Sequence, residues 1–147
     1  MPATMESLEI FRLFVLGKLR QLNMVQELVF KVELVLEEVL TNVIHYAYPE
    51  EAGEVEVGCT IEGNEKFCFC VIDWGIPFNP LERPDPELSE DLSARHVGGL
   101  GIYLVRHLVD ELGYHRQEGG NVLTFCFHLQ SISHQEPSKP PQQYHDK

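Results

Sequence analysis

A long apolar run, residues 28–44, constrains most strongly what this chain can fold into. At about 100° per residue its apolar positions share one arc of a helix, and these positions are Leu28, Val32, Leu36, Val39 and Val43. We therefore predict a buried helix over this run. The chain has 147 residues, which suits one domain with a real core and not two.

Among the polar side chains within this run are Glu38 and Asn42. Residues four apart stack on one helix face, and this pair lies at the border of the apolar arc. The oxygen of a carboxamide is a hard ligand suited to Mg²⁺, and a carboxylate can take a proton or orient a hydroxyl. The alternative is an exposed acidic helix edge without a chemical role, and the pair alone does not decide between the two.

The charge balance argues against a nucleic-acid partner. Lys and Arg number 11 against 23 acidic residues, a formal net charge of −12, and such a surface repels phosphate backbones. No run of about 18 apolar residues is free of charges, and residues 1–4 do not resemble a signal peptide. We therefore expect no direct nucleic-acid contact, no membrane insertion and a cytoplasmic location.

All four cysteines fall in apolar, strand-like runs, at Cys59, Cys68, Cys70 and Cys126. Cys68-x-Cys70 could ligate a metal ion, but a second pair of this kind is missing from the sequence. The more economical interpretation is that they are reduced core cysteines of a cytosolic protein.

Periodicity and turn residues divide the chain into alternating helices and strands. We predict helices over 5–22 and 25–46, a hairpin of strands 54–61 and 66–73, a helix from 98–101 to 112 that Gly113 ends, and strands 114–117 and 122–129. Residues 81–97 are rich in Pro and acidic residues and are predicted to form a lid. Residues 131–147 are predicted to be a disordered tail after a single domain over 1–130.

Two further motifs carry chemistry. Asp73-x-Gly75 closes a predicted strand, where a carboxylate would face a binding site and glycine would let the backbone approach a flat ligand. The run Gly98, Gly99 and Gly101 opens a predicted helix, and free N–H groups at a helix start bind phosphate. Each motif alone is also common in ordinary turns.

The three motifs, in this order, resemble the N, G1 and G2 boxes of the GHKL ATPase superfamily. The sequences around them, residues 37–48, 73–80 and 98–110, resemble the bacterial anti-sigma factor serine kinases of partner-switching systems. The resemblance covers about residues 8–129. It implies an α+β fold, a two-layer α/β sandwich of the GHKL (Bergerat) type, whose sheet is mixed and mainly antiparallel with helices on one face.

The resemblance also implies roles at the site. Asn42 would coordinate Mg²⁺, Glu38 would act as general base, and Asp73 would accept a hydrogen bond from the adenine amino group of ATP. Gly75 would allow the ring to approach closely. The phosphates would lie against the N–H groups of Gly98, Gly99 and Gly101.

The remaining roles follow the same resemblance. Arg95 or His96 in the lid could contact phosphate, and the choice between them stays open. A threonine commonly follows the glycine of the last box and helps to hold adenine, but Asn121 and Val122 stand there in this chain. We therefore assign the adenine contact to Thr124, two residues further on.

The resemblance implies an ATP-binding serine/threonine protein kinase that phosphorylates an anti-sigma factor antagonist, a STAS-domain protein, and sequesters a sigma factor. The first alternative is an ATP-sensing binding module, or an appended regulatory domain, without effective phosphoryl transfer. The second is a domain that has lost nucleotide. Only residues 1–4 precede the first helix, so the family's first strand is missing or very short, and homodimerisation stays open.

Overall fold

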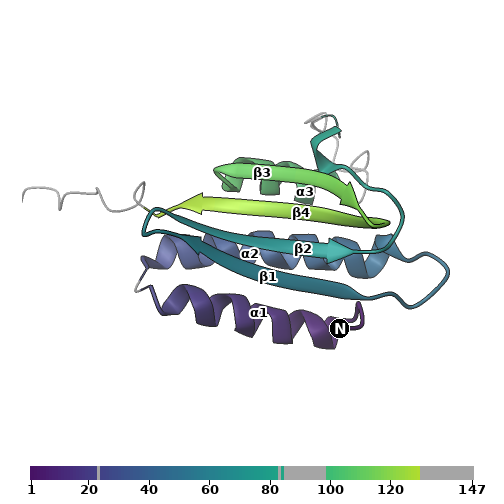
Figure 1. Cartoon of the computed structure of the whole chain (residues 1–147), viewed down its shortest axis with the longest axis horizontal. Helices are drawn as coiled ribbons and strands as arrows, with labels where there is room; N and C mark the ends of the chain where they lie inside the picture. The colour runs from purple at the N-terminus through teal and green to yellow at the C-terminus, as the bar shows by residue number, and fades with distance from the viewer. Residues whose placement is uncertain (23, 83, 85–98, 130–147) are drawn as a thin grey trace, which may run out of the picture.

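The computed structural model describes residues 1–22, 24–82, 84 and 99–129, which form two layers (Figure 1). A four-stranded sheet makes one layer, and three helices cover one of its faces. The elements in chain order are α1 (Met5–Arg20), α2 (Gln26–Asn42), the π-helical turn η1 (Val43–Ala47), β1 (Val55–Glu62), β2 (Lys66–Asp73), the 3₁₀ turn η2 (Pro80–Glu82), α3 (Gly99–Leu108), β3 (Glu111–Gln117) and β4 (Gly120–His128). The predicted fold class is confirmed.

Several predictions concern residues outside this description. They are most of the lid 81–97, with Arg95 and His96, as well as Gly98 and the tail 131–147. In the part of the chain that is described, no helix is long and apolar enough to cross a membrane.

The sheet has the strand order β1-β2-β4-β3, and each neighbouring pair is antiparallel. The expectation of a mainly antiparallel sheet is therefore confirmed, with no parallel pair among the described strands. Two tight turns join the hairpins. Gly63 (φ +59°) lies in the first and Gly119 (φ +80°) in the second, and both values favour glycine.

The core lies between the sheet and the helices. Alternation along β2 and β4 turns phenylalanines toward the helices, and the rings of Phe69 and Phe125 stack with centroids 5.0 Å apart. The predicted apolar arc of α2 faces them, and each of its five residues is at most 5% exposed. The prediction of a buried helix from residues 28–44 is therefore confirmed.

The chain before α1 forms a single bridge instead of a strand. Pro2 pairs with Glu54 on the edge of the sheet, and the N–H of Val55 donates to the carbonyl of Met1 at 2.8 Å. Most of the outer edge of β1 therefore has no neighbouring strand in the described chain.

The prediction that Gly113 ends the third helix is wrong. The helix α3 ends at Leu108, and Gly113 lies inside β3, opposite Thr124 of β4. The N–H of Asp110 already donates to the carbonyl of Cys126 at 3.0 Å. The chain begins to pair with β4 before the helical spacing of apolar residues ends at Leu112. This tertiary pairing overrides the local preference for a helix.

The expectation of four reduced cysteines is also wrong. Cys68 and Cys126 lie directly opposite one another on β2 and β4, with Cα atoms 4.2 Å apart, and form a disulfide. A metal pair of Cys68 and Cys70 is therefore not formed. Cys59 and Cys70 are free, and burial raises the pKa of the Cys59 thiol to about 11, which keeps that thiol protonated and unreactive.

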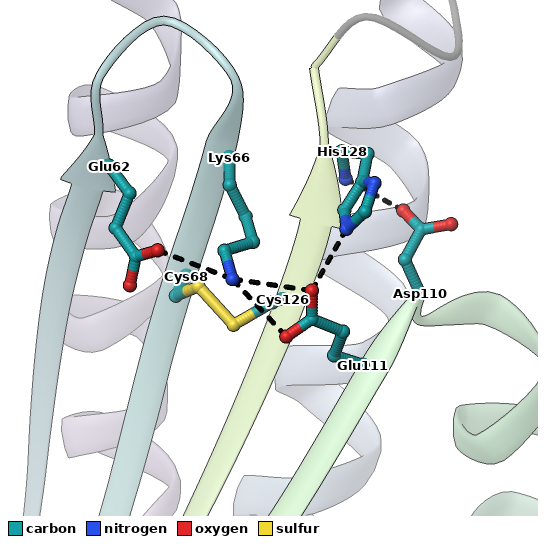
Figure 2. Close-up of polar contacts among 7 residues, drawn as sticks. All are labelled: Glu62, Lys66, Cys68, Asp110, Glu111, Cys126 and His128. Carbon is teal, nitrogen blue, oxygen red and sulfur yellow. Dashed lines mark hydrogen bonds and ion pairs between the residues drawn. A yellow bond between two sulfur atoms is a disulfide. The ribbon is translucent and has the colours of Figure 1, made fainter.

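Charged side chains lie around the disulfide at this end of the sheet (Figure 2). The ammonium of Lys66 lies 3.2 Å from carboxylate oxygens of both Glu62 and Glu111, and Nε2 of His128 lies 2.9 Å from Glu111. These four residues come from the four different strands and form one continuous chain across the sheet. Exposed ion pairs each stabilise little, so the disulfide is the main non-backbone link between β2 and β4 here.

We expect reduction of the disulfide to lower the denaturation midpoint. Closing a loop with the sequence separation of 58 stabilises a fold by about 4 kcal/mol in the chain-entropy model. Urea unfolding of the chain with and without a dithiol reductant measures the loss. Cys70→Ser is the control and should keep the same sensitivity to reductant, while equal midpoints with and without reductant would contradict the role of the bond.

Candidate functional site

Asp73 ends β2 and is 3% exposed, although it carries a carboxylate. Its Oδ1 accepts two hydrogen bonds, one from the N–H of Gly75 at 2.9 Å and one from Nδ2 of Asn121 at 2.9 Å. Both bonds orient the carboxylate through the same oxygen. The second oxygen, Oδ2, is therefore the acceptor that Asp73 offers to any bound molecule.

Asn121, directly opposite Asp73 on β4, is the residue that the sequence analysis missed. Its Nδ2 also donates to the carbonyl of Ile76 at 2.9 Å, while its Oδ1 accepts from the hydroxyl of Tyr114 at 3.0 Å and from Arg116 at 2.8 Å. These partners fix which way the amide points. The signal in the sequence was its place after the last glycine, where the family commonly has threonine.

The turn after Asp73 packs against the end of α2. A Cβ on Gly75 would lie 2.3 Å from the carbonyl oxygen of Ala47, and the N–H of Ile76 donates to that oxygen at 3.0 Å. Glycine is thus required here for contact within the protein. The π-helical turn η1, a feature common at functional sites, carries Ala47 to this place.

Tyr48 holds the same turn from the other side. Its hydroxyl accepts from the N–H of Trp74 at 2.8 Å and donates to the carbonyl of Glu54. Burial raises the pKa of the Tyr48 phenol, which keeps the proton that this donation needs. The loop between η1 and β1 is thereby tied to the backbone next to Asp73.

The side chain of Glu38, on α2, lies next to the glycine run at the start of α3. A Cβ on Gly101 would lie 2.3 Å from Oε2 of Glu38, so the carboxylate occupies its present position because residue 101 is glycine. Gly99 is the first residue of α3. The carboxylate of Glu38 therefore lies at the N-terminal turn of α3, where the helix dipole favours negative charge.

Asn42 lies one turn further along α2. Its Nδ2 is buried and has no hydrogen-bond partner among the described residues. An unpaired buried donor costs about 1–3 kcal/mol, which suggests that a hydrogen-bond acceptor of a bound molecule completes its bonding. Along the chain this amide lies between Glu38 and Ala47, and Ala47 is the residue that contacts the turn after Asp73.

The donors at Glu38 and Asn42 fit a Mg²⁺ ion, which is held by one or two protein oxygens together with oxygens of phosphate and water. The described residues contain no group of three or more His, Cys, Asp and Glu that could hold a metal ion by themselves. A cation here would therefore need ligand oxygens from a bound phosphate compound.

Thr124 does not join this group. It pairs with Cys70 and Gly113 on the face of the sheet that the helices leave open, whereas Asp73 and Asn121 point to the helix side. The assignment of an adenine contact to Thr124 therefore receives no support from its position. The other predicted residues within the described chain lie in three places. Glu38 and Asn42 lie on α2, Asp73 and Gly75 lie at the end of β2, and Gly99 and Gly101 lie at the start of α3.

Comparison with known proteins identifies this arrangement. The family model of the histidine kinase-like ATPase domain matches residues 1–127. The chain belongs to this family. Membership of this ATPase family implies that the chain uses ATP.

Two curated relatives show how far the similarity extends. The chain is 28% identical over 126 residues to "Serine-protein kinase RsbW" of Bacillus thuringiensis (strain Al Hakam), which covers 83% of this chain and 78% of the relative. The same protein of Bacillus anthracis (strain CDC 684 / NRRL 3495) is 27% identical with the same coverage.

A solved structure supports the fold. The histidine kinase domain of the Erythrobacter litoralis EL346 blue-light activated histidine kinase superposes with a TM-score of 0.55 at 23% identity. The match covers 72% of this chain and 46% of that one. At this identity the likeness bears on the fold alone.

Gly101→Ala should displace the carboxylate of Glu38 from the start of α3, because the added methyl group would lie 2.3 Å from its Oε2. We expect weaker nucleotide binding with most of the fold retained, measured by titration with a fluorescent ATP analogue. Gly113→Ala is the matched control, since its new methyl group would lie 3.8 Å from Thr124, an ordinary contact. Equal affinity in the two variants would show that this position of the carboxylate is dispensable.

Asn121→Asp should unfold more easily at pH 8 than at pH 5. The change faces Asp73 with a second carboxylate, which raises the folded-state pKa of one of the two. Stability lost at high pH then returns as the pH falls through that raised value. Denaturant unfolding at both pH values tests this. Asn121→Ala, without the second carboxylate, should show a loss that does not depend on pH in this way.

Proposed function

We propose that this protein is a serine/threonine protein kinase that binds Mg-ATP and phosphorylates an anti-sigma factor antagonist of the STAS-domain class. The observation that carries the proposal is the contact between the carboxylate of Glu38 and Gly101 at the start of α3. In this proposal Glu38 would be the general base, and the start of α3 beside it would be the phosphate cradle. Asn42, one turn away, supplies the candidate metal ligand.

The adenine would bind at the end of β2. Oδ2 of Asp73 would accept a hydrogen bond from the exocyclic amino group, while Asn121 holds the carboxylate through Oδ1. The phosphates would then reach the N–H groups of Gly99 and Gly101, with Gly98 extending the cradle. A helix start binds phosphate through such groups and through its dipole.

Phosphoryl transfer depends mainly on position and charge. The metal, when bound, neutralises charge on the phosphates, and Asn42 would hold it through the amide oxygen. Glu38 would take the proton of the acceptor hydroxyl as the new O–P bond forms and the bond to the leaving ADP breaks. The dipole of α3 would stabilise negative charge beside it.

The cellular setting is part of the proposal. By analogy with the RsbW relatives, the antagonist and a sigma factor would be the protein partners, in the cytoplasm and without direct nucleic-acid contact. The disulfide of Cys68 and Cys126 argues against this location, because disulfides are rare in that reducing compartment.

One observation favours the alternative of an ATP-sensing binding module or appended regulatory domain. The described residues before α1 meet the sheet only through the bridge of Pro2 and Glu54, which leaves most of the outer edge of β1 without a neighbouring strand. A transfer assay separates the two functions. Radiolabelled ATP is incubated with this protein and the STAS-domain protein encoded beside its gene. Label on the antagonist supports the kinase, and ATP binding without transfer supports the module.

Substitutions of Glu38 and of Asn42 should have different effects on nucleotide binding and phosphoryl transfer. Glu38→Gln keeps size and hydrogen bonding but cannot take a proton, so nucleotide binding should survive while transfer falls roughly 10²–10⁴-fold. Asn42→Ala removes the metal ligand, so the Mg²⁺-dependent part of ATP affinity should fall together with transfer. Calorimetric titration with and without Mg²⁺, paired with the label assay, measures both effects.

The outcomes that would contradict these roles are distinct. Transfer at the wild-type rate by Glu38→Gln would remove the general base from the mechanism. Normal Mg-ATP binding by both variants, with easier unfolding, would instead mean that the pair is an ordinary acidic helix edge.

A further inference from the structure

Tyr114 and Arg116 lie on β3, the strand at the edge of the sheet beside β4. The register places Arg116, Asn121 and Asp73 in one row across β3, β4 and β2. Tyr114 is two residues before Arg116, hence on the same face of the sheet, where it is half-buried and packs against the core. Two residues of an edge strand thus share a face with the carboxylate that is proposed to meet adenine.

Three donors converge on the amide oxygen of Asn121. This Oδ1 accepts from the hydroxyl of Tyr114 at 3.0 Å, from Nη1 of Arg116 at 2.8 Å and from the N–H of Phe78 at 3.2 Å. Nη2 of Arg116 also donates to the carbonyl of Gly119 at 2.7 Å, which anchors the guanidinium to the turn between β3 and β4. An amide nitrogen in this place would face donors, so these contacts hold the oxygen there.

The nitrogen of the same amide faces two acceptors. Nδ2 of Asn121 donates to Oδ1 of Asp73 and to the carbonyl of Ile76, both at 2.9 Å. Because the N–H of Gly75 donates to the same Oδ1, that oxygen already has two donors. A bound base therefore meets one acceptor of Asp73, its Oδ2.

A carboxylate that offers one oxygen suits adenine better than guanine. Adenine presents a single exocyclic amino group beside a ring nitrogen that accepts. Guanine presents a ring N–H and a 2-amino group as two adjacent donors, which a carboxylate accepts best with both oxygens, and its 6-carbonyl oxygen is repelled by a carboxylate. Occupation of Oδ1 of Asp73 by Asn121 therefore matches the site to adenine, because polar groups left unpaired on the wrong base cost affinity.

We propose that Tyr114 and Arg116 are positioning residues that set the preference for adenine over guanine, by holding the Asn121 amide against Oδ1 of Asp73. Both act through Asn121 and not by contact with the base. The inference rests on the proposed function, because it requires the base to bind at Asp73.

Titration with Mg-ATP and with Mg-GTP tests the inference through the ratio of the GTP to the ATP dissociation constant. Tyr114→Phe and Arg116→Met each remove a donor to Asn121 and should lower this ratio several-fold, and the double variant should lower it about tenfold or more. Loss of positive charge or looser packing would weaken both nucleotides alike and leave the ratio unchanged. Arg116→Lys keeps the charge and one donor, so it should retain more of the ratio than Arg116→Met.

Two controls isolate the cause. His115→Gln changes an exposed residue of the same strand whose side chain lies on the opposite face of the sheet, and it should keep the wild-type ratio. Inosine triphosphate has the ring N–H and the 6-carbonyl of GTP but lacks the 2-amino group. Relative to ATP, the double variant should therefore gain less affinity for inosine triphosphate than for GTP.

The outcomes separate this inference from the proposed function. If the wild type prefers ATP and the double variant keeps the same ratio, the inference is overturned while the proposed function stands. An equal fall of the ratio in His115→Gln, or an equal gain for inosine triphosphate, would overturn it as well. A wild type that binds neither nucleotide would overturn the proposed function and the inference together. Thermal unfolding without nucleotide should show that all variants fold.

Discussion

The hydrogen bond between Asn121 and Asp73 joins the two central strands at the end where the site is built. It is buried, with both residues at most 3% exposed, so its loss would leave polar groups unpaired in the core. Through Arg116 the same amide is held from β3, and through the N–H of Gly75 the same carboxylate shapes the turn after β2. The position of the Asp73 carboxylate, whose Oδ2 is the proposed acceptor for adenine, thus depends on three of the four strands.

The helix α2 provides the second half of the site. Glu38, Asn42 and Ala47 follow one another along α2 and η1. Glu38 lies at the start of α3, and Ala47 contacts the turn after Asp73. Between them, Nδ2 of Asn42 has no hydrogen-bond partner among the described residues. One rigid helix therefore fixes the spacing between the end that would hold adenine and the end that would hold phosphate. Its apolar face, buried against the sheet, keeps that spacing constant.

Much of this architecture follows from local pattern. β2 has the predicted bounds, and the apolar arc of α2 is buried as its periodicity indicates. The misses share a tertiary cause. The helical spacing continues to Leu112, yet pairing with β4 makes a strand there. The disulfide of Cys68 and Cys126 depends on a strand order that periodicity does not give.

The site residues also divide into those that short sequence motifs predict and those whose position depends on the tertiary structure. The order of motifs predicted Glu38, Asn42, Asp73 and the glycines, because the residues of each motif are close in sequence. The choice of Thr124 over Asn121 depended instead on strand parity, since residues an odd number apart point to opposite faces. The structure also changes the reason for two glycines. Gly75 is needed where it touches the backbone of Ala47, and Gly101 leaves room for the carboxylate of Glu38, so both glycines serve contacts within the protein.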